Sequence, residues 1–278
     1  MWYNFTMAET KVKYMEQRKI NGYLCDTNYY INDLKTDLTL VFIHGYGVDS
    51  AMWTPQIEYF SERYSIINID VRGHGNSKPC KDFSVRLAAE DVYNIILKEE
   101  IQNYLLIGLS MGGYIIQEFA HNYGKAKGYL IAGSTPIFLP VYTPFEKWML
   151  RHSVALMNLY PWDLLKKEMT KACASTPEAR EIFRTMINKF SKKEFVSSWS
   201  GINTCLREVK FQFDAPVFIG CGENDKTGTI KKCMKYWSDY YPGCKTFSIE
   251  NAAHVANLDS PGSFNQVLEN FIQHSTSS

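Results

Sequence analysis

The sequence has no excess of charge of either sign. Its 278 residues include 30 lysines and arginines against 29 aspartates and glutamates, a formal net charge of +1. A near-neutral chain exerts no long-range attraction on nucleic acid or on anionic lipid. We therefore expect no nucleic-acid partner. No uncharged run approaches the ~20 residues needed to span a bilayer, so we expect no stable membrane insertion either.

Paired cysteines are also lacking. The seven cysteines are odd in number, and no two of them have Cys-x-x-Cys spacing. The first 17 residues contain no apolar segment typical of a signal peptide. These features predict reduced thiols in a cytoplasmic protein rather than a disulfide framework. Because the cysteines and histidines show no ligand spacing, we expect neither a metal nor an organic cofactor.

What the sequence does contain is an alternation of short apolar runs and amphipathic segments. Apolar runs on both faces of a strand, separated by helices, are typical of a parallel sheet covered by helices on both sides. The alternation predicts an α/β fold in one large domain. The expected strands are 38–45, 65–73, 103–110, 127–134, 215–222 and 244–250, and the expected helices are 52–64, 85–101, 111–124, 230–241 and 260–273.

The alternation stops between residues 135 and 213, where strand signals are scarce and helical stretches are rich in Met, Trp, Tyr and Leu. We predict a core made of residues 1–134 and 214–278, with 135–213 inserted as a helical cap. Most apolar residues of such an insertion dock it onto the sheet, and a few line a pocket. Phe138, Trp148 and Met157 are the predicted substrate contacts.

A single serine stands between a buried strand and a helix, in Gly108-Leu109-Ser110-Met111-Gly112. This Gly-x-Ser-x-Gly pattern is typical of a nucleophile elbow, a tight turn that exposes the serine hydroxyl above the sheet edge. Glycines are needed on both sides because larger side chains would collide with the adjoining strand and helix. The alternative interpretation of the pattern alone is an ordinary strand-to-helix turn with an idle serine.

A serine hydroxyl needs a base, and the base needs an orienting carboxylate. Asp225 and His254 follow the last two predicted strands, at the sheet edge where Ser110 lies. We predict Ser110 as nucleophile, Asp225 as acid and His254 as base. Glu223 and Asp239 remain alternative acids. The competing histidines fit the expected order less well: His44, His74, His121, His152 and His274.

Catalysis of this type also needs an oxyanion hole. The segment His44-Gly45-Tyr46-Gly47 ends an early strand, where its glycines let the backbone approach a substrate carbonyl. The backbone N–H groups of Tyr46 and Met111 are the predicted donors. A simple glycine turn is the alternative interpretation.

Five motifs in this order resemble the α/β-hydrolase family over nearly the whole chain: "HGYG" at 44–47, "DVRGHGNS" at 70–77, "GLSMGG" at 108–113, "GEND" at 222–225 and "AAHVANLDSP" at 252–261. The resemblance implies the roles given above for Ser110, Asp225, His254, Tyr46 and Met111. It also implies that the insertion covers the site. Within the family, the serine motif and the C-terminal segment look most like small carboxylesterases and enol-lactonases.

The predicted function is hydrolysis of an ester, thioester or lactone through an acyl-enzyme on Ser110. The expected substrate is a small molecule with a hydrophobic acyl or aromatic group, and the expected assembly is a monomer or homodimer. Three alternatives stay open at this point. They are a carbon–carbon bond hydrolase, a lyase or synthase using the same residues, and a ligand receptor built on a hydrolase fold.

Overall fold

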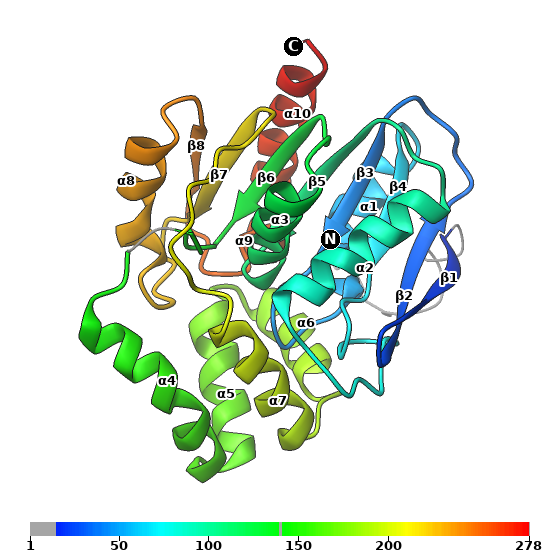
Figure 1. The fold of residues 1–278 in the computed structure, drawn as a ribbon. Helices are drawn as coiled ribbons and strands as arrows, with labels where there is room; N and C mark the ends of the chain where they lie inside the picture. The colour runs from blue at the N-terminus through cyan, green and yellow to red at the C-terminus, as the bar shows by residue number, and fades with distance from the viewer. Residues whose placement is uncertain (1–14, 139–140, 278) are drawn as a thin grey trace, which may run out of the picture.

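A computed structural model describes residues 15–138 and 141–277. Its centre is an eight-stranded sheet in the order β1-β2-β4-β3-β5-β6-β7-β8 (Figure 1). From β4 to β8 every neighbouring pair is parallel, which confirms the predicted fold class. The strands are β1 (Met15–Gly22), β2 (Cys25–Asn32), β3 (Thr39–Ile43), β4 (Ser65–Ile69), β5 (Tyr104–Leu109), β6 (Gly128–Ala132), β7 (Val217–Gly222) and β8 (Lys245–Ile249).

The sequence pattern did not predict the hairpin of β1 and β2. These strands pair antiparallel with each other, and β2 pairs antiparallel with β4. In β1, at the edge of the sheet, only Ile20 is buried. Charged residues on an edge strand protect the sheet from pairing with other chains. Such a strand has no apolar run from which it could be predicted in the sequence.

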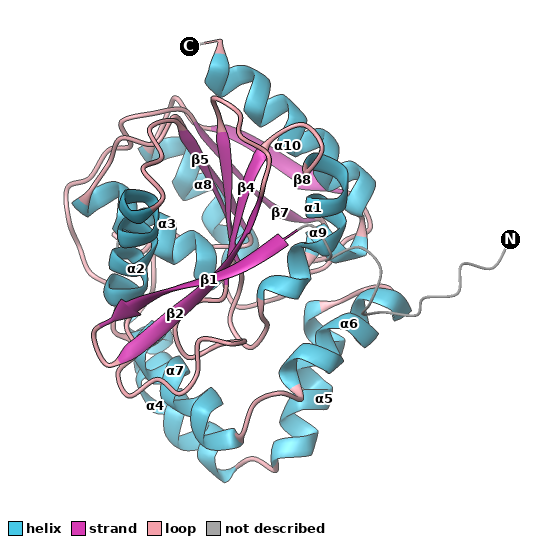
Figure 2. Cartoon of the chain, turned by 90° about the vertical axis from the view of Figure 1, so that its right-hand side faces the viewer, coloured by secondary structure: helices cyan, strands magenta, loops and turns pink. Residues whose placement is uncertain are grey.

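Helices cover both faces of the sheet. Figure 2 shows α2, α3 and α8 on one side and α1, α9 and α10 on the other. Their bounds are α1 (Thr54–Phe60), α2 (Val85–Lys98), α3 (Met111–Asn122), α8 (Ile230–Tyr240), α9 (Ala256–Asp259) and α10 (Pro261–Thr276), and a 3-10 turn, η2 (Ser50–Trp53), precedes α1. Between these layers, all six residues of β5 are buried. Burial stabilises each large aliphatic side chain there by roughly 1.5–3 kcal/mol.

Four helices follow β6 and lie together beyond the ends of the strands (Figure 1). They are α4 (Pro144–Leu159), α5 (Trp162–Cys173), α6 (Pro177–Ile187) and α7 (Lys192–Asn203). Capping boxes begin two of them, with Thr143 and Glu146 at α4 and Ser191 and Glu194 at α7. All four lie within the range predicted for the cap. Across the described residues, no helix has the length and apolar character required to cross a bilayer.

Candidate active site

Ser110 occupies a strained turn between β5 and α3. Its backbone has φ 55° and ψ −114°, a conformation that non-glycine residues rarely adopt. The neighbouring glycines make the turn possible. A Cβ on Gly108 would lie 2.6 Å from the carbonyl carbon of Gly112, and a Cβ on Gly112 would lie 2.1 Å from the carbonyl oxygen of Ile43. The geometry is that of a nucleophile elbow rather than of a relaxed strand-to-helix connection.

Asp225 and His254 form a buried hydrogen-bonded pair. The Nδ1 of His254 lies 2.9 Å from Oδ2 of Asp225, and the backbone N–H of Thr227 donates to Oδ1 at 2.8 Å. Burial alone would raise the pKa of the Asp225 carboxyl, but the charge and hydrogen bond of His254 and the Thr227 hydrogen bonds lower it overall. Asp225 is therefore a carboxylate that orients the imidazole. The alternative acids, Glu223 and Asp239, are exposed, and neither forms a hydrogen bond or ion pair with this ring.

The end of β6 brings the imidazole and the serine to the same place. The backbone N–H of Ser110 donates to the carbonyl of Ala132 at 2.8 Å. The next residue, Gly133, packs against the His254 ring, because a Cβ there would lie 3.3 Å from both Cε1 and Nδ1. Within the described residues, the Ser110 hydroxyl makes no hydrogen bond. The hydrogen bond between a catalytic serine and its histidine often forms only when substrate binds.

His44 fixes the loop that follows β3. Its Nε2 accepts a hydrogen bond from the Val71 N–H at 2.9 Å, and its Nδ1 donates to the Gly45 carbonyl at 2.7 Å. These two bonds require the neutral tautomer, and burial lowers the pKa of the ring accordingly. His44 thus supports the backbone of residues 44–47 and is not placed as a general base.

The two predicted oxyanion donors lie on either side of the serine. Within the described residues, neither the Tyr46 N–H nor the Met111 N–H has an intramolecular acceptor. The loop approaches the serine closely, since a Cβ on Gly45 would lie 3.4 Å from the Ser110 Cβ. The Met111 N–H stands at the start of α3, where the helix dipole favours negative charge. Two free amides beside a serine can donate hydrogen bonds to a developing oxyanion.

The remaining histidines lie elsewhere. His74 is fully buried, with Nδ1 3.0 Å from the Arg72 carbonyl, and burial is the main cause of its strongly lowered pKa. His121 contacts the Phe138 ring at the far end of α3, His152 lies against Trp148 on α4, and His274 lies near the end of α10.

A cavity of about 350 Å³ opens beside Ser110. Its described lining comes from the loop after β3, from α3, α4, α7 and α8, and from the loops after β6, α7 and β7. The lining residues are Tyr46, Ser110, Met111, Tyr114, Thr135, Tyr142, Glu146, Met149, Leu150, Ser153, Trp199, Ile202, Asn203, Leu206, Thr227, Gly228, Thr229 and Ile230. Most of these side chains are apolar or aromatic, as a pocket for an organic group requires.

None of the three predicted substrate contacts lines this cavity. Phe138 is buried against Phe211 and the guanidinium of Arg207, away from the serine. Trp148 is 56% exposed, and Met157 is half-buried against the core.

The rotation of α4 explains the difference for Trp148, whereas Phe138 precedes this helix. The residues of α4 that face the cavity are 146, 149, 150 and 153, which share one face of a helix. Trp148 points off that face, and Met157 lies one turn beyond it. Tyr114 and Thr135 were not predicted as lining residues. A signal was present for Tyr114, because a residue four positions after the serine lies one helical turn above it.

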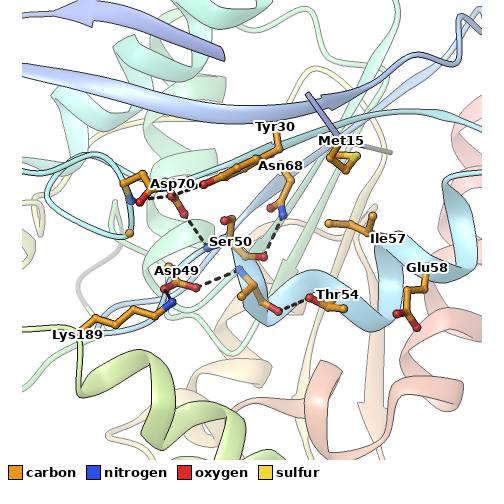
Figure 3. A pocket seen from close by; sticks show the side chains of 13 residues that line it. Met15, Tyr30, Asp49, Ser50, Thr54, Ile57, Glu58, Asn68, Asp70 and Lys189 are labelled. Carbon is orange, nitrogen blue, oxygen red and sulfur yellow. Dashed lines mark hydrogen bonds and ion pairs between the residues drawn. The ribbon is translucent and has the colours of Figure 1, made fainter. Parts of the chain in front are cut away.

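A second cavity, of about 320 Å³, is lined in part by η2 and the start of α1, and Ser110 does not line it (Figure 3). Its polar groups bond to one another. The Ser50 N–H donates to Asp70 at 2.9 Å, the Asn68 amide donates to the Ser50 carbonyl at 2.9 Å, and Asp49 pairs with Lys189 at 2.6 Å. These contacts hold η2, which follows residues 44–47, and connect it to the segment between α6 and α7.

In residues 15–138 and 141–277, no group of three or more His, Cys, Asp or Glu side chains is arranged to hold a metal ion. The polar groups gathered around Ser110 are instead a carboxylate, an imidazole, a hydroxyl and two amides. This set is suited to acyl transfer through an oxygen nucleophile.

Comparison with known proteins identifies the family. A model of the alpha/beta hydrolase family matches residues 40–267. The chain belongs to this family. It is thus an α/β-hydrolase enzyme, as the motifs implied.

Individual relatives are distant in sequence but match over most of their length. The 3-oxoadipate enol-lactonase 1 of Acinetobacter baylyi is 23% identical, over 87% of this chain and 91% of the relative. A pimeloyl-[acyl-carrier protein] methyl ester esterase of Legionella pneumophila is 26% identical, over 88% and 100% respectively. The structure of a thermophilic esterase from Thermogutta terrifontis superposes with a TM-score of 0.78 and 19% identity, covering 94% of this chain and 99% of that one.

Proposed function

We propose that this α/β hydrolase cleaves a carboxylic ester, thioester or lactone through an acyl-enzyme on Ser110. The observation that carries the proposal is the buried Asp225–His254 pair. The His254 ring packs against Gly133, and the preceding residue, Ala132, accepts a hydrogen bond from the Ser110 backbone. The names of the relatives, an enol-lactonase and a methyl ester esterase, support the same class of bond.

In the first half of the reaction, His254 removes the proton from the Ser110 hydroxyl, and the serine oxygen attacks the substrate carbonyl. Asp225 keeps Nδ1 protonated, so that Nε2 is the basic atom, and stabilises the imidazolium that forms. The imidazolium then gives its proton to the leaving alkoxide or thiolate. A water molecule, activated by the same imidazole, hydrolyses the acyl-enzyme and regenerates the serine.

The negative charge of each tetrahedral intermediate falls on the former carbonyl oxygen. The Tyr46 and Met111 amides are fixed before the substrate arrives, because His44 holds one loop and α3 holds the other. Donors that need no reorganisation stabilise the transition state more than water does, and one such donor contributes about 10²–10³ in turnover.

The test combines covalent labelling with turnover. The intact protein is treated with a fluorophosphonate and its mass is measured, and hydrolysis of p-nitrophenyl acetate and butyrate is followed in parallel. We expect a single adduct on wild type, none on Ser110→Ala, and turnover that Ser110→Ala loses. If the wild-type mass does not shift, the nucleophile is assigned wrongly. Acylation without turnover would instead indicate a receptor, and preferential cleavage of a vinylogous diketone would indicate a carbon–carbon hydrolase.

A further inference from the structure

The cavity beside Ser110 contains no positive charge. None of its described lining residues is a lysine, arginine or histidine, and its one carboxylate belongs to Glu146. Hydrogen bonds from the backbone and hydroxyl of Thr143 lower the pKa of that carboxyl, so Glu146 is ionised at neutral pH. An acyl group that carries its own carboxylate would meet no cation here and one like charge. The lining therefore favours a neutral acyl group.

One wall of the same cavity carries a chain of hydroxyl groups. The Tyr114 hydroxyl lies 3.0 Å from Thr135 Oγ1, which lies 2.7 Å from the Tyr142 hydroxyl. The Thr229 side chain lies near the Tyr142 hydroxyl. Thr135 is 2% exposed, whereas the two tyrosines are half-buried and line the cavity. A ligand therefore reaches this chain through the phenol groups.

The chain leaves one hydrogen unused. Each hydroxyl supplies one hydrogen, so three hydroxyls joined by two hydrogen bonds leave one hydrogen over, whichever way the bonds run. The nearby Thr229 hydroxyl does not change this count, because it brings a hydrogen of its own. A ligand oxygen that accepts the unused hydrogen replaces the water that would otherwise accept it, whereas a wholly apolar acyl group would leave it unpaired.

We infer that the acyl group cleaved at Ser110 is neutral and largely apolar and carries a second oxygen, a ketone carbonyl, that accepts a hydrogen bond from the Tyr114–Thr135–Tyr142 chain. This inference rests on the proposed function and names its substrate class, an oxo-acyl ester or the corresponding lactone. The scissile carbonyl faces the Tyr46 and Met111 amides, and the second oxygen faces the phenols.

The experiment compares p-nitrophenyl esters of matched chain length. The oxo series contains the 4-oxopentanoyl, 5-oxohexanoyl and 6-oxoheptanoyl esters, and the plain series contains the pentanoyl, hexanoyl and heptanoyl esters. We expect kcat/KM for at least one oxo ester to exceed that of its plain partner about 3- to 10-fold, the effect of one neutral hydrogen bond. The glutaryl monoester, which carries a carboxylate, should react more slowly than the hexanoyl ester.

The variants Tyr114→Phe, Tyr142→Phe and the double variant identify the donor. We expect at least one of them to bring the oxo-to-plain ratio near 1 while the plain ester is still hydrolysed, which shows that the fold and the serine are intact. Tyr236→Phe, on an exposed tyrosine of α8, is the matched control and should keep the wild-type ratio.

Two results would overturn the inference while leaving esterase activity in place. They are a wild-type ratio near 1 at all three chain lengths, or a ratio that the double variant leaves unchanged. Serine-independent or absent turnover of every ester would overturn the proposed function itself, and this inference with it.

Discussion

The hydroxyl of Tyr46 donates a hydrogen bond to the backbone carbonyl of Phe195, with 2.6 Å between the two oxygens. The ring of Tyr46 also packs on the Phe195 ring, with centroids 4.3 Å apart. Tyr46 belongs to the loop after β3, and Phe195 belongs to α7. Tyr46 thus has two parts with different roles. Its backbone amide is proposed to bind the oxyanion, and its side chain holds α7 in place.

Tyr46→Phe separates these two contributions. The variant keeps the amide and the ring but loses one buried hydrogen bond. We expect the free energy of unfolding to fall by about 0.5–1.5 kcal/mol and kcat/KM to fall several-fold. Loss of the amide donor itself would cost about 10²–10³. Chemical denaturation and ester hydrolysis measure both effects, and Tyr240→Phe, on an exposed tyrosine, is the control. A loss as large as that of Ser110→Ala would contradict this account.

Asp225→Asn tests the choice of acid. The amide cannot hold the imidazole in the tautomer that makes Nε2 basic, so we expect kcat to fall by about 10⁴ with little change in the fold. Glu223→Gln is the matched control two residues away. Its carboxylate is exposed and accepts only a 3.2 Å bond from the Asn251 N–H, so turnover should stay close to that of wild type. Similar losses in both variants would leave the acid unassigned.

The lowered pKa of Asp225 also predicts how stability depends on pH. Burial of this carboxyl opposes ionisation, but its contacts with His254 and Thr227 outweigh burial. A carboxyl whose pKa is lower in the folded state stabilises the fold above its unfolded pKa of about 3.9, and this contribution is lost as pH falls through the folded value. The difference in unfolding free energy between wild type and Asp225→Asn should therefore be constant from about pH 5 to 7 and shrink below about pH 4. A difference that grows on acidification would show the opposite shift.

Five of the predicted strands, β3 to β7, were predictable because each is a short apolar run that is buried along its whole length. In the sixth, β8 at the edge of the sheet, only Ile249 is buried. The hairpin of β1 and β2 was not predictable in the same way. Its edge strand buries only Ile20, so its pairing with β2 depends on backbone hydrogen bonds rather than on an apolar pattern.

The residues of the candidate site also differ in how far the sequence could predict them. Ser110, Asp225 and His254 are marked by residue type and by position after a strand, both of which can be read in a sequence. The contacts of the acyl group depend on how far α4 is rotated, which the sequence does not state. Trp148 is as apolar as Met149 and Leu150 on the same helix, yet only the latter two line the cavity.

Gly112→Ala tests the packing that creates the serine turn. The added Cβ would lie 2.1 Å from the Ile43 carbonyl oxygen, a backbone atom that cannot move without shifting β3. We expect a loss of at least about 3 kcal/mol in unfolding free energy, or failure to fold. Gly262→Ala is the control, because a Cβ there meets nothing within 4 Å and alanine favours the α10 helix. Near-native stability of Gly112→Ala would show that the approach of α3 to β3 is less close than described.

One face of α4 is expected to select the substrate. Leu150 lines the cavity beside Ser110, whereas Trp148, two residues earlier, is 56% exposed and stacks near Phe145 and His152. Leu150→Ala removes about three methylene-equivalents of apolar contact, each worth about 0.8 kcal/mol when fully buried. We therefore expect KM for a hexanoyl ester to rise about 10-fold, with a smaller effect for an acetyl ester that does not reach α4.

Trp148→Ala is the matched control, because it removes a larger apolar side chain from the same helix. Since that side chain does not face the cavity, KM for both esters should stay within about 2-fold of wild type, while stability changes little at an exposed position. Michaelis–Menten kinetics on the two esters give all four values. A larger rise in KM from Trp148→Ala than from Leu150→Ala would mean that α4 turns its other face to the bound acyl group, and the cavity described beside Ser110 would not be the acyl site.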